Sequence, residues 1–358
     1  MNITDAPFDI LNVLKVFGMG AFSFFVGILI APTLRKILYE MKAWPERSRS
    51  KAVTGETATV VSALRKDERR DVPRMGGIII WGTTLAITLL FWGLAEVTTS
   101  PLLEKLNFLS RNQTWLPLFT LVIASSIGLV DDLMFIRSSG TYVAGGISLR
   151  KRIVLVALIG LIGGLWFFRQ NGIDDILIPF FGEVRLGFWF VPFFILVMLA
   201  TFSGGIIDGL DGLAGGVLTS AFGAYMGIAF FQTQYDIAAM LSVMVGALLA
   251  FLWFNIPPAA FYMGETGILG LTTTLTVVAV LTDAVAVLPI IALPLLATSA
   301  SAILQIASKK YRGKKLFLAA PLHHHFEALG WTQSQVTMRY WVVSAVVAII
   351  GMVIMLVG

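Results

Sequence analysis

The chain has 358 residues, of which 57% are hydrophobic and only 13% are charged, and its formal net charge is +5. Soluble globular domains carry about 25% charged residues, so this composition excludes an ordinary soluble protein. The chain contains no cysteine, which also excludes disulfide bonds and thiol catalysis.

Ten stretches of the chain are expected to cross a membrane as helices. Roughly 20 apolar residues span a bilayer, and a helix satisfies its own backbone hydrogen bonds in lipid. Several of the stretches are short or contain glycine and proline, so tilts and kinks are expected. We therefore predict an all-α integral membrane protein with a single polytopic domain over residues 1–358. The expected spans are 17–34, 76–95, 115–130, 153–168, 187–202, 212–231, 237–254, 267–282, 284–307 and 340–357.

Basic residues gather in every second loop. Lys and Arg are frequent between the first two expected spans, at 150–152 before the fourth span, and at 309–315 before the tenth. By the positive-inside rule these loops face the cytoplasm, and ten spans then place both termini outside. The outside loop 169–186 alternates apolar residues around Gly182, which predicts a short β-hairpin.

Acidic residues that are candidates for chemistry all lie on the expected cytoplasmic side. Asp131 and Asp132 end the third span in "SIGLVDDLMF". Ionisable groups at membrane depth are costly and are therefore functional candidates. For this pair, a solvated helix end and a site for Mg²⁺ or phosphate are both open interpretations, since Mg²⁺ takes oxygen ligands and bridges to phosphates.

A second acidic stretch, "GGIIDGLDGLAGG", lies between the fifth and sixth spans. Asp208 and Asp211 are three residues apart, so they share a face of a helical turn. The glycines allow the backbone to approach a ligand closely, and a helix N-terminus offers free N–H groups to an anion. A glycine-rich surface for helix packing is the alternative, but packing does not explain why two aspartates stand in this stretch.

The stretch "WFNIPPAAFYMGETG" precedes the eighth span and combines Asn255, two prolines, Tyr262 and Glu265. Broken backbone at membrane depth is tolerated where it lines a cavity. An aromatic ring and an amide at such a place suit a nucleobase, which the ring stacks on and the amide hydrogen-bonds. An ordinary interfacial turn is the alternative.

Arginines precede the second span in "RKDERRDVPRMGG". The positive-inside signal accounts for many of these bases. Arginine also suits bidentate recognition of phosphate, which makes Arg69 and Arg74 candidates for binding an anion.

All three histidines stand together in "APLHHHFEALGW", just before the last span. Three consecutive side chains do not all point one way, so a compact zinc site is not expected. Imidazoles here are suited to donate hydrogen bonds to diphosphate or sugar oxygens, and they titrate near physiological pH. We expect His323 and His324 to face a ligand, and we leave open whether His325 is a structural partner.

Together these stretches resemble the polyprenyl-phosphate N-acetylhexosamine-1-phosphate transferases over roughly residues 20–357. The superfamily is marked by "PRMGG", "DD" after the third span, "DGLDGLAGG" and "FNIPPAAFYMGETG". The stretch "APLHHHFEALGW", followed by "VTMRYWVVSAV", resembles its phospho-N-acetylmuramoyl-pentapeptide transferase branch. The resemblance implies a Mg²⁺-dependent transfer of phospho-MurNAc-pentapeptide from UDP-MurNAc-pentapeptide to undecaprenyl phosphate, which gives lipid I and UMP in peptidoglycan synthesis. It also implies a bacterial cytoplasmic membrane location with the active site facing the cytoplasm.

The resemblance further implies roles for individual residues. Asp131 and Asp132 match acids at the lipid phosphate, Glu265 takes the position of a metal-binding aspartate, and Tyr262 that of a ring stacking on uracil. The catalytic residues implied are Asp131, Asp132, Glu265, His323 and His324, with Asp131, Asp132 and Glu265 also implied as metal ligands. The substrate-binding residues implied are Arg69, Arg74, Asp208, Gly209, Leu210, Asp211, Asn255, Tyr262 and His325.

The sequence departs from the family pattern at several of these places. Glu265 replaces an aspartate, and Phe135 replaces the lysine of a DDxxK pattern. Gly205 replaces an asparagine, and Lys66 and Arg69 stand where the family has the histidine and lysine of HxxK. These changes leave open an altered donor specificity or an impaired enzyme.

The expected reaction is direct attack of the lipid phosphate on the β-phosphorus of the donor, with Mg²⁺ neutralising the diphosphate. The lipid phosphate is already an anion, so we prefer this route to a covalent aspartyl intermediate. Three alternatives stay open: a UDP-N-acetylhexosamine donor without a peptide, a transporter or channel, and a catalytically silent homologue that binds nucleotide. Acids at the span ends rather than the midplane disfavour transport. No nucleic-acid partner is expected, and a homodimer is left open.

Overall fold

The computed structural model describes residues 10–44, 71–110, 113–137, 146–170 and 172–358. The candidates Lys66 and Arg69 lie outside these residues. The helices are α1 (Ile10–Val13), α2 (Met19–Glu40), α4 (Ile78–Val97), α5 (Pro101–Leu106), α6 (Trp115–Arg137), α7 (Leu149–Gln170), α8 (Phe190–Ser203), α9 (Leu213–Phe231), α10 (Tyr235–Asn255), α11 (Glu265–Leu281), α12 (Leu288–Ile291), α13 (Leu293–Arg312), α14 (Leu322–Ala328) and α15 (Gln333–Val357). Short 3-10 or π turns are η2 (Leu14–Gly18), η3 (Gly187–Trp189), η4 (Gly204–Ile207) and η5 (Val285–Val287).

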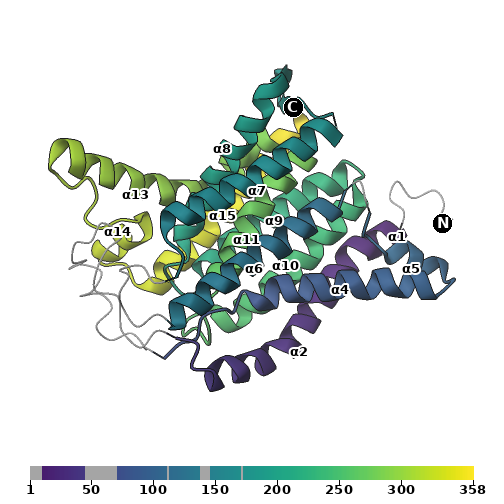
Figure 1. The fold of residues 1–358 in the computed structure, drawn as a ribbon, viewed down its shortest axis with the longest axis horizontal. Coiled ribbons are helices and arrows are strands. Elements are labelled where there is room, and N and C mark those ends of the chain that lie inside the picture. The colour runs from purple at the N-terminus through teal and green to yellow at the C-terminus, as the bar shows by residue number, and fades with distance from the viewer. Residues whose placement is uncertain (1–9, 45–70, 111–112, 138–145, 171) are drawn as a thin grey trace.

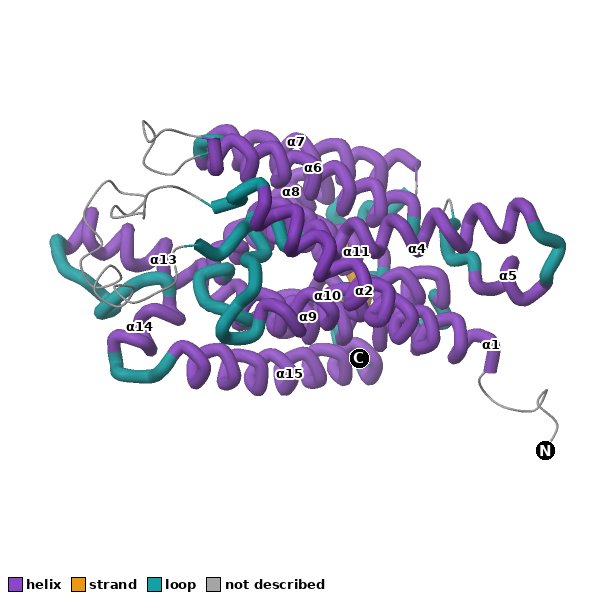
Figure 2. Tube along the Cα trace, turned by 90° about the horizontal axis from the view of Figure 1, so that it is seen from below, coloured by secondary structure: helices purple, strands orange, loops and turns teal. Residues whose placement is uncertain are grey.

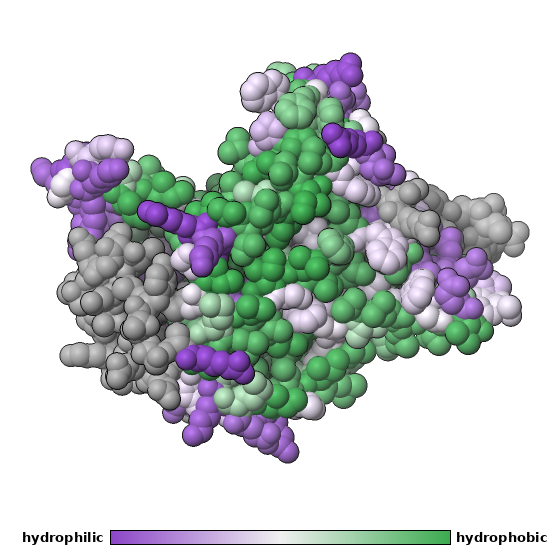
Figure 3. Space-filling model, in the orientation of Figure 1, coloured by the Kyte–Doolittle hydropathy of each residue, from purple (hydrophilic) through white to green (hydrophobic). Residues whose placement is uncertain are grey.

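The helical class and the hairpin are both confirmed. Strands β1 (Asp175–Ile178) and β2 (Gly182–Arg185) pair antiparallel, with Asp175 opposite Arg185. Figure 1 shows the long helices running side by side as one bundle, with α13 reaching out from it. The surface between the polar ends is mostly apolar, as expected for helices that face lipid (Figure 3).

The prediction of ten spans is only partly confirmed. Among the described residues, eight helices are long and apolar enough to cross a membrane. A ninth span is reached if Val285–Ile291 and Leu293–Arg312, which meet at a bend of 76°, count as one. The remaining predicted span is α11, which has only 17 residues. Residues 266–280 of α11 are all buried, so protein rather than lipid surrounds this helix and its length need not match the bilayer.

Helix α11 lies at the centre of the bundle. It packs against α6, α8, α4 and α9, and in Figure 2 α6 and α7 run along one side of the bundle while α15 runs along the other. Small residues allow membrane helices to approach closely. Gly128 of α6 faces the backbone of Glu265 and Thr266. This contact brings the next turn of α6, which carries Asp131 and Asp132, beside the start of α11.

Replacing Gly128 with alanine is expected to lower the free energy of unfolding by about 1–3 kcal/mol, because an added methyl group would collide with the Glu265 carbonyl. The matched control is Gly93→Ala in α4, where an added methyl group meets nothing within 4 Å. It should leave stability unchanged or raise it slightly, since alanine favours helix. Thermal unfolding of the detergent-solubilised protein measures both. Equal Tm values would contradict the close approach of α6 and α11.

The two ends of the bundle differ in character. At one end, a partly buried ion pair joins Lys15 to Asp236 at the start of α10, and the Gln232 side chain donates to the Thr282 carbonyl at 3.0 Å. At the same end, the hairpin meets the C-terminus, where Phe180 N–H donates to the Gly358 carbonyl at 3.3 Å. The candidate acids lie at the opposite end of the same helices.

Candidate active site

Four of the predicted carboxylates come together where α6, α11 and the turn before α9 meet. Asp131 and Asp132 end α6, Glu265 begins α11, and Asp208 follows η4. Asp131, Asp132 and Asp208 each lie within electrostatic reach of Glu265. The fold thus gathers residues that are far apart in the chain, such as Asp132 and Thr266, which are 134 residues apart.

Asp132 caps the N-terminus of α11 from a neighbouring helix. Thr266 N–H donates to Asp132 Oδ2 at 3.0 Å, and the backbone N–H of Glu265 also hydrogen-bonds this carboxylate. The first N–H groups of a helix lack partners within the helix, and its N-terminus favours negative charge. The Asp132 side chain is 0% exposed. Asp132 therefore fixes where Glu265 stands.

Arg74 is held against Asp132 rather than extended into solvent. Its Nε donates to Asp132 Oδ1 at 3.1 Å, and its guanidinium carbon lies 4.8 Å from the centre of the Phe135 ring. Tyr262 N–H donates to the Pro73 carbonyl and Gly76 N–H to the Tyr262 carbonyl, both at 2.8 Å, which docks the "PRMGG" segment at this place. Phe135 thus supports a neighbouring cation through its ring face.

Arg152, at the start of α7, joins two carboxylates and was not a candidate from the sequence. Its Nη2 lies 2.6 Å from Asp131 Oδ2, and its Nη1 pairs with Glu265 Oε1. Its Nε donates to the Ile147 carbonyl at 3.1 Å, while Ile147 N–H donates to Asp131 Oδ1. In the sequence this residue belongs to the run at 150–152 and looked like a topology signal.

Asp211 and Asn255 hold the backbone around the acids. Ala259 N–H donates to Asp211 Oδ2 at 3.0 Å. Asn255 accepts from Gly212 N–H at 3.0 Å and donates to the Phe261 carbonyl at 2.8 Å. Gly212 has a φ of +74°, a conformation that glycine adopts freely. These bonds hold the segment 256–264 against the start of α9.

Three further candidates, Leu210, Tyr262 and Gly209, lie in the two segments that these bonds join. Leu210 is buried, and Tyr262, in the segment before α11, is half-buried. Gly209 N–H donates to the Ile207 carbonyl at 2.7 Å. A methyl group at Gly209 would lie 2.5 Å from His323 Nε2, so this glycine lets the imidazole pack on the turn.

The histidines divide into separate roles. His323 is fully buried against Gly209, and its ring centre is 4.2 Å from that of His324. His324 Nδ1 pairs with Glu327 Oε2 at 2.5 Å, which fixes the orientation of the imidazole. His325 Nδ1 accepts from Leu318 N–H at 3.2 Å, so His325 braces the loop before α14. Glu327 was not singled out from the sequence.

Asp208, which lies outside the spans, has a strongly perturbed pKa. Burial among protein atoms, with the nearby Glu265 charge, raises the pKa of Asp208 to about 7, although Arg74 and the Gly264 N–H lower it. Its side chain is enclosed deeply enough to lose hydration while part of its surface remains accessible. Asp208 therefore titrates near neutral pH.

The Asp208→Asn variant is expected to become more stable relative to wild type as pH rises. A carboxyl whose pKa is higher in the folded state contributes stability at low pH, and this contribution is lost between its ordinary pKa of 3.8 and about 7. Asparagine has no proton to lose over this pH range, so its contribution does not change. The measurement is Tm for both proteins at about pH 5 and about pH 8. A difference in Tm that does not change with pH would contradict the raised pKa.

The carboxylates fit a divalent metal ion through their chemistry. Among the residues that the structure describes, no three His, Asp or Glu side chains already stand in metal-ligating geometry. However, Asp131 and Glu265 jointly hold one cation, the Arg152 guanidinium. Carboxylate oxygens are the ligands that Mg²⁺ prefers. The donor set is thus suitable for Mg²⁺ at the place that the guanidinium takes.

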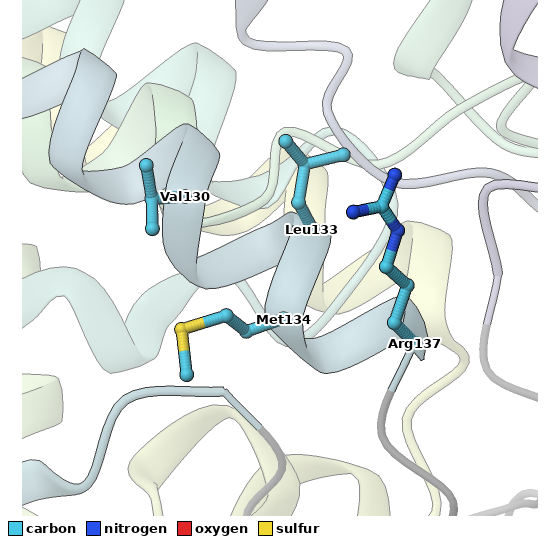
Figure 4. Close-up of a pocket in the computed structure, with 4 residues that line it drawn as sticks. All are labelled: Val130, Leu133, Met134 and Arg137. Atoms are coloured by element: carbon cyan, nitrogen blue, oxygen red, sulfur yellow. The ribbon is translucent and has the colours of Figure 1, made fainter.

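A separate pocket of about 390 Å³ lies on α6, lined by Val130, Leu133, Met134 and Arg137 (Figure 4). Apart from Arg137 its lining is apolar, and none of the candidate acids contributes to it. It is therefore distinct from the acidic site.

Comparison with known proteins identifies relatives over most of the chain. The model of the family described as glycosyl transferase family 4 matches residues 114–283, which include α6 and α11. A curated relative from Chloroflexus aurantiacus is 34% identical over 78% of this chain and 76% of its own length. Relatives from Pelagibacter ubique and Bartonella quintana are 30% identical over 96% of this chain and 95% of the relative, and 33% over 80% of both. All three are named phospho-N-acetylmuramoyl-pentapeptide-transferase.

Proposed function

The chain belongs to glycosyl transferase family 4, and from this premise we propose that it transfers phospho-MurNAc-pentapeptide from UDP-MurNAc-pentapeptide to undecaprenyl phosphate. The products are lipid I and UMP, as in peptidoglycan synthesis. The protein acts in the bacterial cytoplasmic membrane with its acidic site facing the cytoplasm. Membership of a transferase family disfavours the transporter or channel.

The observation that carries this proposal is the convergence of Asp131, Asp132, Asp208 and Glu265 with Arg74 and Arg152 at one end of the bundle. Paired acids and guanidiniums at a membrane surface suit two anionic substrates, one of them a lipid. The relatives' name supplies the donor, and the histidine segment is the part of the chain that resembles their branch.

The reaction forms one bond and breaks one. An oxygen of the lipid phosphate bonds to the β-phosphorus of the donor, and the bond from that phosphorus to the bridging oxygen breaks, so UMP leaves with this oxygen. The nucleophile is already ionised, and no side chain has to remove a proton. Mg²⁺ supplies charge neutralisation at the diphosphate when it is bound.

The chain's own residues orient the reactants. Asp131 and Glu265 would provide oxygen ligands for the metal ion, and Glu265 is kept in place by the cap that Asp132 makes on α11. Buried His324, fixed by Glu327, and His323 beside Gly209 place imidazoles next to the turn that carries Asp208. Tyr262, half-buried, is the ring for the uracil. Preorganised groups of this kind stabilise charge that develops in the transition state.

The test is a donor screen with the purified full-length protein in nanodiscs that contain undecaprenyl phosphate. UMP release and the lipid product are followed with UDP-MurNAc-pentapeptide and with UDP-N-acetylglucosamine, each with Mg²⁺ or with a chelator. Lipid I formed only with the peptide donor and Mg²⁺ is expected. Product from the other donor alone would assign a different substrate, and no product from either donor would indicate a silent homologue.

A further inference from the structure

We propose that Arg152 is a built-in place-holder for the metal ion: its guanidinium holds the Asp131–Glu265 pair until a divalent cation displaces it. The inference rests on the metal site of the proposed function and adds a competing residue to it. It concerns what happens before substrate binds.

The first argument is the geometry of the guanidinium. Its two terminal nitrogens contact carboxylates from two different helices, Asp131 of α6 and Glu265 of α11. Its third nitrogen donates to the Ile147 carbonyl at 3.1 Å. All three nitrogens of the guanidinium therefore have a neighbouring acceptor group, each from a different residue.

The second argument is burial. The side chains of Arg152, Asp131 and Glu265 are 17%, 4% and 24% exposed. Surface ion pairs are screened by water and contribute little, whereas removing one partner of a buried pair is costly, because it leaves a charge without compensation. If one partner leaves, the remaining charges are left in an environment that hydrates them poorly. Any ion that takes the place of Arg152 must therefore replace its charge.

The third argument is charge balance. Asp131, Asp132 and Glu265 carry three formal negative charges, and among the described residues Arg74 and Arg152 are the cations paired with them. Arg74 remains bound to Asp132. A guanidinium and a divalent cation repel each other at contact distance, so they exclude each other from the Asp131–Glu265 pair. Displacement of Arg152 leaves this pair with the two negative charges that a divalent ion matches.

The consequence is that Arg152 weakens metal binding in the absence of substrate. Its charge reduces the repulsion between two carboxylates that are fixed by their helices. A metal ion must therefore compete with the guanidinium for these two carboxylates. The released guanidinium is then available to an anion at the start of α7. Arg150, two residues earlier, is exposed and provides a matched control of the same charge.

The experiment is a titration with Mn²⁺, a paramagnetic ion that takes the same oxygen ligands as Mg²⁺. The full-length protein is purified in detergent without donor, and free Mn²⁺ is measured by electron paramagnetic resonance. We expect Arg152→Gln to bind Mn²⁺ about tenfold more tightly than wild type, which lies within the usual range of coupling between sites. Arg150→Gln should bind as wild type does, and Arg152→Lys, which keeps a cation, should fall between them.

A second measurement separates competition from a change of shape. Methylguanidinium added to Arg152→Gln should weaken Mn²⁺ binding again, and it should have little effect on wild type. Equal or weaker Mn²⁺ binding by a monodisperse Arg152→Gln protein, while wild type binds, overturns the place-holder alone. No Mn²⁺ binding by wild type or any variant overturns both the place-holder and the metal site of the proposed function.

Discussion

Replacing Asp131 with asparagine is expected to lower turnover roughly 1,000-fold, the loss that follows removal of a group aimed at transition-state charge. Asparagine has nearly the same size and still accepts the hydrogen bond from Ile147 N–H, so the fold should persist. It removes one of the two carboxylates that pair with the Arg152 guanidinium and that, in the proposed function, would hold the metal ion. Initial rates of UMP release give kcat and KM, and the effect should be mainly on kcat.

The control for this variant is Asp174→Asn. Asp174 pairs with Arg185 at 2.9 Å on the hairpin, at the end of the bundle away from the acidic site. The control should keep the wild-type rate. Near-normal turnover by Asp131→Asn would remove this carboxylate from the reaction, and a phosphorylated Asp131 trapped during turnover would replace direct attack with a covalent intermediate.

The sequence was sufficient to predict the helical membrane class, the hairpin and the cluster of acids. Apolar segments and alternating basic loops report helices directly, because the bilayer constrains each span by itself. The span count was less secure, since α11 is apolar but protected by other helices rather than by lipid. Hydropathy cannot distinguish these two surroundings, because both favour the same residues.

The residues that sequence reasoning missed share one physical cause. Arg152, Thr266 and Glu327 act through partners that lie far away in the chain or on a neighbouring turn. An arginine at a cytoplasmic span end has the same sequence pattern whether it sets topology or closes an ion pair.

Several candidates that the sequence did identify are bonded to other groups of the protein in the structure. Both polar atoms of the Asn255 amide bond backbone groups, and Asp211 accepts from Ala259 N–H. In the proposed function, these two residues would therefore shape the wall of the nucleotide pocket rather than contact the nucleotide. Arg74, expected at a phosphate, is bound to Asp132. In this way the acidic site is built from residues that neutralise and position one another.

Replacing Asp132 with alanine is expected to destabilise the fold as well as abolish activity. The change removes the cap on α11 and leaves the guanidinium of Arg74 without its buried partner. Breaking a buried pair by removing one member typically lowers the free energy of unfolding by about 3–5 kcal/mol. The measurement is the Tm of the detergent-solubilised protein, followed by the loss of its monodisperse peak.

The double variant Asp132→Ala with Arg74→Ala separates the two causes. If the unpaired guanidinium accounts for most of the loss, the double variant should be more stable than Asp132→Ala alone, because contacting residues are not additive. If the helix cap accounts for it, the second change should bring no recovery, since Thr266 N–H still lacks its acceptor. A wild-type Tm in Asp132→Ala would contradict both the unpaired guanidinium and the lost helix cap as causes. Asp132 would then be assigned a role on the substrate alone.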